Sequence, residues 1–538
     1  MPLTNAEVVA RTLADEGVQY AFGLPGGEVV VLVDALRRAG IRFLLVGHEA
    51  SAAFMADVTG QITGRPGVCV STLGPGAANL TTGIASAYLE RSPLLALTAQ
   101  IPQDLYSSFT HQRLPLDRVF AGITKQSLVL DGVDTRAKVE AALRLATSGR
   151  PGPVHLALPG DVAAAAPRVS DTSSSTAGLA SAAPRVPASG DRAADEARQA
   201  LQEARRPLLL VGLGARPEDA PAVRHLLDVT HWPWMTTPKA KGIVSELHPR
   251  FLGVAGGMAL DRVVLETLEL SDLIVGIGFD PVECDKPWFV DRRIVNVSRW
   301  PTAEGAYRPI EIVGAIGAEV SALAAHLAPQ PWPQPLVDER RRAILRSPAP
   351  AGPSPAEALS PLAALHALRS VLPEETVVAV DVGSHKLLAG QCWPTTVPHT
   401  FFVSNGLSSM GYGLPAAIAA SLHFPGRPIA ALIGDGGMLM MAHNLPLIAS
   451  LRLPIVTVVF VDGSLSLIRL AQARRGLLPY GVDFPPPDFT RFASACGIEA
   501  ARAESLDALK MHAARAVSMR VPCLLEIPVN LHDYEDLI

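Results

Sequence analysis

The fold of this chain is decided by the stretch Ile429-Ala430-Ala431-Leu432-Ile433-Gly434-Asp435-Gly436-Gly437. Its apolar residues predict a buried β-strand, and the glycines predict a turn into a helix. Glycine lets the backbone approach phosphate oxygens closely, and a helix N-terminus offers free amides and the positive end of its dipole. Asp435 adds a carboxylate of the kind that Mg²⁺ uses when it joins a protein to a phosphate. The stretch therefore predicts a site for a diphosphate and a divalent cation.

A second carboxylate is expected at the same edge of the sheet. The next predicted strand, Ile455–Val461, ends in Asp462-Gly463-Ser464. Asp462 follows Asp435 by 462 − 435 = 27 residues, about what one helix and one strand require. Each aspartate alone has a plain alternative, since Asp435 can be a helix N-cap and Asp462 a turn residue. Together, the two carboxylates favour a metal site.

Strand and helix patterns alternate along the rest of the chain. Amphipathic stretches predict helices over Thr4–Glu16 and Ala193–Ala204, and β-branched runs predict strands over Arg42–Val46, Val68–Thr72 and Leu208–Val211. This alternation is typical of βα units around mainly parallel sheets. We therefore expect an α/β protein built from doubly wound parallel sheets.

Two segments of biased composition divide the chain. Ser170–Gly190 is rich in Ser, Ala, Thr and Pro, and Ala328–Pro355 is rich in Pro with a short basic helix inside, so both are predicted linkers. A chain of 538 residues is also too long for one hydrophobic core. We predict three domains, at 1–168, 190–327 and 356–538.

The first and third domains share an order of motifs. Gly64-Arg65-Pro66 precedes a strand that ends in Gly74-Pro75-Gly76, and Gly426-Arg427-Pro428 precedes the strand that ends in Gly434-Asp435-Gly436. This order indicates an ancient duplication. The alternative is that any two doubly wound domains share a strand, a glycine turn and a helix. Under both interpretations the two domains have similar folds.

The composition favours a globular enzyme with a small-molecule substrate. A net charge of −5 without a long basic run gives no electrostatic footprint for nucleic acid or an anionic membrane. Five cysteines lie far apart without a Cys-x-x-Cys pair, which predicts reduced thiols. The N-terminus shows no secretion signal, and the apolar run Leu453–Val461 is too short for a membrane span of about 20 residues. We expect a cytoplasmic protein that binds neither nucleic acid nor a membrane.

Gly434-Asp435-Gly436 followed by Asp462-Gly463-Ser464 resembles the metal and diphosphate signature of thiamine diphosphate enzymes. Asn is usual in that family where this chain has Asp462, and Asp keeps an oxygen ligand there. The resemblance implies the cofactors thiamine diphosphate and Mg²⁺. The metal ligands that it implies are Asp435, Asp462 and, through its backbone oxygen, Ser464.

Other motifs resemble the parts of that family that hold the cofactor. Asp381-Val382-Gly383-Ser384-His385 is similar to its early phosphate loop, and Met410 matches the apolar residue that props the cofactor into a bent shape. Glu49, in His48-Glu49-Ala50, matches the glutamate of its proton relay. The alternatives are a core methionine and a glutamate that only begins a helix. The cofactor-binding residues implied by the resemblance are Pro25, Gly26, Glu49, Thr72, Asn79, Gly383, Ser384, His385, Ser408, Met410, Gly434, Gly436, Gly437, Ser464 and Leu465.

Within the family, the likeness to acetolactate synthases extends over nearly the whole chain. Phe22–Gly27 and Thr72–Asn79 are similar to cofactor loops of those enzymes, and His111-Gln112 is similar to their acceptor-side segment. The catalytic residues that this implies are Glu49, Gly27 and Gln112. The sequence departs at Arg113-Leu114-Pro115-Leu116, since family members often carry an acidic or small residue after the glutamine.

The central domain resembles the catabolic type of acetolactate synthase. Gly278-Phe279-Asp280-Pro281-Val282-Glu283 is similar to the form that lacks flavin, so we expect no FAD. The resemblance implies a carboligase that decarboxylates a pyruvate-like 2-oxo acid and joins it to a second carbonyl compound. It also implies a homodimer or homotetramer with active sites between subunits. Asp462–Arg469 is similar to thiamine-dependent decarboxylases as well, so a 2-oxo acid decarboxylase, another C–C lyase and a non-catalytic protein of this fold stay open.

Overall fold

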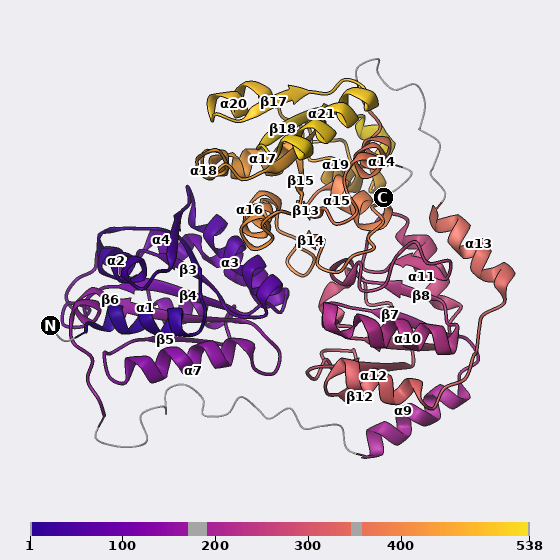
Figure 1. The fold of residues 1–538 in the computed structure, drawn as a ribbon, viewed down its shortest axis with the longest axis horizontal. Helices are drawn as coiled ribbons and strands as arrows, with labels where there is room; N and C mark the ends of the chain where they lie inside the picture. The colour runs from indigo at the N-terminus through magenta and orange to yellow at the C-terminus, as the bar shows by residue number, and fades with distance from the viewer. Residues whose placement is uncertain (1–2, 171–190, 346–357, 536–537) are drawn as a thin grey trace. The chain divides into compact units, whose positions relative to one another are not determined.

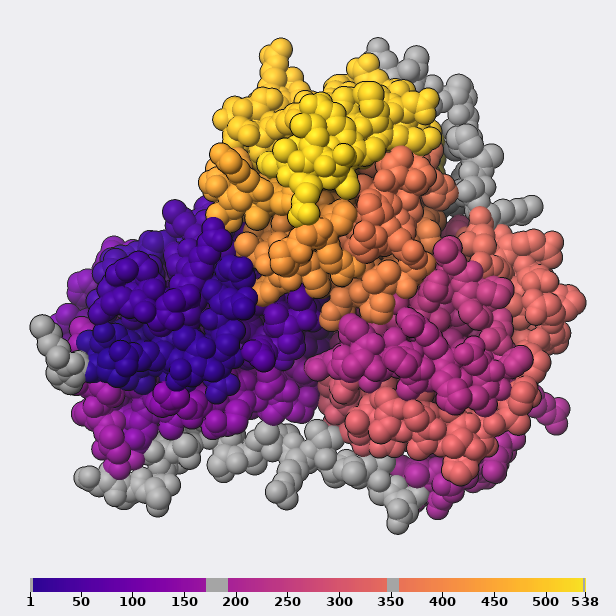
Figure 2. Space-filling view, in the orientation of Figure 1, coloured from indigo at the N-terminus to yellow at the C-terminus, as the bar shows by residue number. Residues whose placement is uncertain are grey.

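The structure is a computed structural model that describes residues 3–170, 191–345, 358–535 and 538; the remaining residues are grey in Figures 1 and 2. Its strands form three parallel sheets of six strands each (Figure 1). The α/β fold class of doubly wound parallel sheets is thus confirmed. The contacts of the chain divide it into two compact units, each described by itself below.

Unit 1 contains the first sheet. Its strands are β1 (Tyr20–Leu24), β2 (Arg42–Leu45), β3 (Gly67–Ser71), β4 (Leu94–Gln100), β5 (Gln126–Val129) and β6 (Pro153–Pro159). Its helices are α1 (Asn5–Asp15), α2 (Val30–Arg38), α3 (Glu49–Thr63), α4 (Pro75–Asn79), α5 (Thr81–Leu89), α6 (Leu116–Ala121), α7 (Thr135–Thr147) and α8 (Gly160–Ala164). The strand order is β2-β1-β3-β4-β6-β5. β3, β4 and β6 are buried along their whole length, as expected of parallel strands covered on both faces.

Local side-chain bonds fix the starts of two helices in unit 1. Thr4 caps α1, because its hydroxyl accepts a bond from Glu7 N at 3.3 Å while the Glu7 carboxylate accepts one from Thr4 N at 2.8 Å. His48 caps α3, because its Nδ1 accepts a bond from Ala50 N at 3.1 Å. Glu49 is the first residue of α3 and lies just beyond β2, after Val46, Gly47 and His48, as the sequence predicts.

Residues 407–425 and 441–451, distant in sequence, complete unit 1. They contain α16 (Gly413–His423) and α18 (Leu445–Leu451). α16 packs along α3, where His423 Nε2 lies 3.2 Å from Thr59 Oγ1. Ser51, also on α3, contacts His443 Nε2 at 3.0 Å.

Unit 2 contains the central sheet and the third sheet. The central strands are β7 (Pro207–Val211), β8 (Trp234–Thr236), β9 (Phe251–Val254), β10 (Leu273–Ile277), β11 (Ile294–Ser298) and β12 (Ile310–Val313). The helices around them are α9 (Asp191–Glu203), α10 (Ala220–Thr230), α11 (Asp261–Glu269), α12 (Ile316–Ala324) and α13 (Gln334–Leu345). The order is β12-β11-β10-β7-β8-β9. Counted from the β9 edge this is 3-2-1-4-5-6, the order of dinucleotide-binding sheets.

The third sheet repeats the topology of the first. Its strands are β13 (Val377–Val380), β14 (Phe401–Val403), β15 (Ile429–Gly434), β16 (Ile455–Val461), β17 (Glu499–Arg502) and β18 (Cys523–Pro528). Its helices in unit 2 are α14 (Pro361–Val371), α15 (Ser384–Cys392), α17 (Asp435–Met441), α19 (Ser466–Arg474), α20 (Phe489–Ala495) and α21 (Leu506–Met519). The order is β14-β13-β15-β16-β18-β17. Both sheets therefore have the order 2-1-3-4-6-5, which confirms that the first and third domains are similar.

The first predicted linker lies outside the described residues except for Ser170, and the second lies outside them from residue 346 onward. Within the second linker, α13 is the basic helix expected from the sequence. Its Val337 and Ile344 are buried in a hydrophobic cluster of the central sheet, so this part of the segment belongs to the packed core. The domain bounds 1–168, 190–327 and 356–538 stay a prediction.

The apolar run Leu453–Val461 contains β16, a strand inside the third sheet. In the described part of the chain, no helix combines the length and the hydropathy needed to cross a membrane.

Candidate functional site

Asp435 and Asp462 lie at the ends of the neighbouring strands β15 and β16. The Asp435 carboxylate accepts bonds from the backbone amides of Gly463 at 2.7 Å, of Gly436 at 2.8 Å and of Asp462 at 3.2 Å. Asp462 in turn accepts a bond from Ser464 N at 3.0 Å. The fold thus brings the two aspartates and Ser464 into one cluster of loops.

The electrostatics of this cluster fit a divalent cation. Burial raises the pKa of Asp435, and burial together with the charge of Asp435 raises the pKa of Asp462 to about 6. Two buried like charges are costly unless a cation lies beside them. Over residues 3–170, 191–345, 358–535 and 538, no group of three or more His, Cys, Asp or Glu side chains could hold a metal ion by itself. A hard cation here would therefore need backbone and ligand oxygens as well.

The loop before α15 fits a diphosphate. Ser384 and His385 are buried, and neither Ser384 Oγ nor His385 Nε2 has a hydrogen-bond partner in the described residues. Burial lowers the pKa of His385 to about 4, so the ring is neutral near pH 7. Buried polar atoms without a protein partner are expected to bind water or a ligand.

Glycines keep this loop open to a ligand. A Cβ atom on Gly434 would lie 3.1 Å from the His385 ring, and one on Gly383 would lie 2.9 Å from it. A side chain at Gly437 would collide with the Asp381 carboxylate. Larger residues at these glycine positions would therefore fill the space beside Ser384 and His385.

In unit 1, Glu49 is buried at the start of α3, with 4% of its surface exposed. Asn79 Nδ2 donates a bond to Glu49 Oε2 at 2.9 Å. The other oxygen, Oε1, faces Gly76, where a Cβ atom would lie only 3.0 Å away. Helix α4, which follows β3, thus fixes one oxygen of Glu49 through Asn79 and leaves the other beside Gly76.

The loop after β1 joins the same edge of the first sheet. A Cβ atom on Gly26 would lie 2.6 Å from Thr72 Oγ1, so this loop packs directly on the end of β3. Thr72 Oγ1 donates a bond to Glu28 Oε2 at 2.6 Å. Pro25 and Gly27 are exposed, and a Cβ atom on Gly27 would have no neighbour within 4 Å.

Gln112 lies on a loop that is held by hydrogen bonds from the neighbouring Arg113 side chain to the loop's own backbone. Gln112 is exposed with a φ of +55°, and a Cβ atom on Gly74 would lie 2.8 Å from Gln112 Cβ. Arg113 Nη1 donates bonds to Tyr106 O at 2.7 Å and to Ser107 O at 3.3 Å, and its guanidinium lies 5.7 Å from the Tyr106 ring centroid. The departure from the family pattern at Arg113 therefore has a structural role.

Two acidic side chains beside the predicted residues were not singled out from the sequence. Glu28 directly follows the Gly26-Gly27 loop, a position that could have drawn attention to it. Asp483 belongs to none of the motifs found in the sequence, yet its carboxylate accepts a hydrogen bond from Ser464 Oγ at 2.7 Å. It lies 19 residues after Ser464, so local sequence offers no signal for it.

The predicted site residues are split between the two units. Those in unit 1 are Pro25, Gly26, Gly27, Glu49, Thr72, Asn79, Gln112, Ser408 and Met410. Those in unit 2 are Gly383, Ser384, His385, Gly434, Asp435, Gly436, Gly437, Asp462, Ser464 and Leu465. Ser408 is exposed with a φ of +52°, and Met410 is half-buried.

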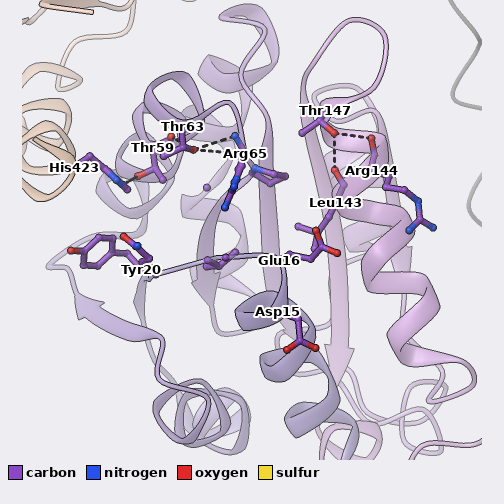
Figure 3. A pocket seen from close by; sticks show the side chains of 15 residues that line it. Asp15, Glu16, Tyr20, Thr59, Thr63, Arg65, Leu143, Arg144, Thr147 and His423 are labelled. Carbon is purple, nitrogen blue, oxygen red and sulfur yellow. Dashed lines mark hydrogen bonds between the residues drawn. The ribbon is translucent and has the colours of Figure 1, made fainter.

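A hollow of about 620 Å³ lies elsewhere on unit 1 (Figure 3). Its lining includes Tyr20, Arg65 and Gly67, close to where β1 and β3 begin. The loops that carry Glu49 and Thr72 lie at the opposite, carboxyl ends of the strands, where ligands of open α/β sheets bind. This hollow contains none of the predicted site residues.

Comparison with known families assigns the class that this fold and site define. The family models match at residues 3–119 (thiamine pyrophosphate enzyme, N-terminal TPP binding domain), 194–323 (central domain) and 381–527 (C-terminal TPP binding domain). The chain belongs to the thiamine pyrophosphate enzyme family. It is a thiamine diphosphate-dependent enzyme.

Within this family, the chain is similar to acetolactate synthases along nearly its whole length. The acetolactate synthase of Bacillus subtilis (strain 168) is 31% identical over 98% of this chain and 94% of its own length. The catabolic acetolactate synthase of Raoultella terrigena is also 31% identical, over 98% and 95%. A probable acetolactate synthase large subunit of Methanocaldococcus jannaschii is 30% identical, over 98% and 92%. The resemblance seen in the sequence is confirmed.

Proposed function

We propose that this enzyme is a carboligase that decarboxylates a pyruvate-like 2-oxo acid and joins the remaining fragment to a second carbonyl compound. The observation that carries this proposal is the similarity to acetolactate synthases over 98% of the chain. Bound thiamine diphosphate would supply the electron sink that decarboxylation needs. The residues of the chain would bind and orient it, exclude water and move a proton.

Glu49 is the proposed proton relay. Its Oε2 is occupied by the Asn79 amide at 2.9 Å, which leaves Oε1 to hold a proton for the cofactor. A carboxyl group with one fixed oxygen and one free oxygen is suited to general acid–base work. Its burial keeps bulk water from competing for that proton.

The diphosphate and Mg²⁺ are assigned to the loops of unit 2. Asp435, Asp462 and the backbone oxygen of Ser464 are the proposed metal ligands. The raised pKa values of both aspartates support this, since a divalent cation would offset their mutual repulsion. Ser384 Oγ and His385 Nε2, buried without partners in the described chain, are the proposed phosphate contacts. The remaining proposed cofactor contacts are Gly383, Gly434, Gly436, Gly437, Leu465, Ser408, Met410, Pro25, Gly26 and Thr72.

The substrate side is assigned to Gly27 and Gln112. The open space at Gly27 leaves room for a substrate beside the cofactor. Gln112 is exposed on a loop that Arg113 holds by two backbone carbonyls, so the loop backbone is fixed where the Gln112 amide would meet an acceptor.

The central domain is proposed to bind no FAD. In a dinucleotide-binding sheet, the loop after the first strand faces the pyrophosphate. Here the amide of Leu213, in that loop, donates to Glu283 Oε2 at 2.9 Å. The amide of Lys239, after β8, donates to the other oxygen at 3.3 Å. The carboxyl group of Glu283 thus occupies donors that a flavin nucleotide would need.

The active enzyme is proposed to be a homodimer or homotetramer whose sites combine the first domain of one subunit with the third domain of another. The family resemblance implies this assembly, and large apolar side chains are exposed on both units of the chain. Leu105 and Phe109 are 45% and 47% exposed on unit 1, and Leu478 and Tyr480 are 86% and 88% exposed on unit 2. Light scattering that shows an active monomer at assay concentrations would contradict this assembly.

The reaction is tested by mass spectrometry of products from a panel of 2-oxo acids, each with and without an aldehyde acceptor, in the presence of thiamine diphosphate and Mg²⁺. A product that joins two carbonyl fragments is expected. Release of the aldehyde alone would make the enzyme a decarboxylase. Cofactor binding without any turnover would favour a non-catalytic protein of this fold.

A further inference from the structure

The loop that carries the proposed metal ligands is held by a second segment, Val482–Phe484, which we call the strap. Leu465 N donates a bond to Val482 O at 2.7 Å, and Phe484 N donates one to Gly463 O at 2.9 Å. These bonds pair Ser464 with Asp483 as an isolated antiparallel bridge. Because the bonds use the groups on either side of the bridged pair, the carbonyl oxygen of Ser464 stays outside the pairing.

Side chains reinforce the strap at the same residue. Ser464 Oγ donates a bond to Asp483 Oδ1 at 2.7 Å. Arg469, on α19, donates from Nη1 to both oxygens of Asp483, each at 2.7 Å. The Asp483 side chain is 55% exposed and that of Arg469 is 29% exposed, so neither is needed to fill a core. One carboxylate therefore ties the loop after β16 to the helix that follows it.

We propose that Asp483 is a positioning residue that holds Ser464 so that its backbone oxygen can bind Mg²⁺, an inference that rests on the proposed function. Groups that orient metal ligands without touching the metal typically change metal affinity by about 10–100-fold when they are removed. Asp483 contacts the ligand residue through a side-chain bond and through the paired backbone. Its loss would let the Ser464 carbonyl turn away from the cation.

A simple charge effect of Asp483 and the positioning role predict opposite changes of Mg²⁺ affinity in the variant Arg469→Gln. If Asp483 only attracted the cation through space, removing the positive charge of Arg469 would tighten Mg²⁺ binding. If Asp483 acts by position, Arg469→Gln releases the carboxylate from its second anchor and weakens Mg²⁺ binding. The two explanations therefore separate without any measurement of catalysis.

The test is calorimetric titration of thiamine diphosphate into the full chain at a series of Mg²⁺ concentrations. Asp483→Ala should require about 10–100-fold more Mg²⁺ for half-maximal cofactor binding, and Asp483→Asn and Arg469→Gln should shift in the same direction. Asp507→Asn is the matched control, since the Asp507 side chain is 97% exposed on another helix. Unchanged Mg²⁺ dependence in both Asp483 variants, or tighter binding in Arg469→Gln, would overturn the proposal.

Hydrogen–deuterium exchange of the metal-free protein gives a second readout. Peptides that cover 462–466 should exchange faster in Asp483→Ala than in the wild type, and protection equal to that of the wild type would count against the strap. If the wild-type protein showed no Mg²⁺-dependent cofactor binding, that result would contradict the proposed function itself. A wild type with that dependence and unaltered variants would overturn only the role of Asp483.

Discussion

Replacing Asp435 by alanine tests whether this residue is a metal ligand or only caps the backbone amides around it. The carboxylate accepts bonds from the amides of Gly463, Gly436 and Asp462 at 2.7, 2.8 and 3.2 Å. A hydrogen bond to a charged group contributes about 1.5–3 kcal/mol, and a simple helix cap contributes about 1 kcal/mol. Because the three bonds share one acceptor group and one of them is long, we expect metal-free Asp435→Ala to lose about 2–4 kcal/mol of unfolding free energy.

If Asp435 is a metal ligand, Asp435→Ala also loses the stabilisation that bound ligands give to the folded state, which a helix cap would not provide. A ligand present at about 100 times its Kd stabilises the folded state by about 2.7 kcal/mol. If Asp435 binds the cation, the variant loses this gain as well, because the diphosphate is then held without its metal bridge. The loss measured with Mg²⁺ and thiamine diphosphate should therefore exceed the loss measured without them by about 2–3 kcal/mol.

The assay is differential scanning calorimetry with a chelator, and again with saturating Mg²⁺ and thiamine diphosphate. The comparison uses the ligand-induced rise in Tm, since a chain of several domains need not unfold in one step. Asp435→Asn keeps the side-chain volume and one acceptor oxygen, and covers the case in which the alanine variant does not fold. A ligand-induced rise as large in both variants as in the wild type would refute the metal assignment.

Two further predictions concern Glu49 and Glu283. Glu49→Gln should slow deuterium exchange at the thiazolium carbon of the bound cofactor by about 10²–10⁴-fold, because the glutamine amide has the shape of the glutamate but cannot act as a carboxylic acid. Cofactor affinity should change less. An unchanged exchange rate would remove Glu49 from the mechanism. Burial raises the pKa of Glu283 to about 8 from its ordinary value of 4.5. Below pH 4.5 both folded and unfolded chains keep the proton, and between about pH 4.5 and 8 the unfolded chain loses it first. Stability should therefore fall as pH rises through this window, by at most about 1.4 kcal/mol per pH unit, and Glu283→Gln should remove this part of the slope. A difference in Tm between Glu283→Gln and the wild type that stays constant from about pH 5 to 8 would contradict this.

The sequence alone determined the parts of this protein that depend on neighbours along the chain. An apolar run with a glycine turn after it specified β15 and the start of α17, and the observed ends of the predicted strands lie within two residues of the expected ones. The pairing of Asp435 with Asp462 also followed from sequence, because parallel strands joined by a helical connection end at the same edge of a sheet. Family resemblance then suggested the chemistry that is proposed for these positions.

Only the tertiary structure decided which side chains meet across loops. The identical order 2-1-3-4-6-5 of the first and third sheets depends on long-range strand pairing that no local periodicity encodes. Asn79 reaches Glu49 across 30 residues, and Asp483 reaches Ser464 across 19. Such partners are chosen by where folded loops come together, because hydrogen bonds form only at close range and at defined angles. A pattern of residue types can therefore place a carboxylate at the edge of a sheet, but it cannot name the group that holds the carboxylate there.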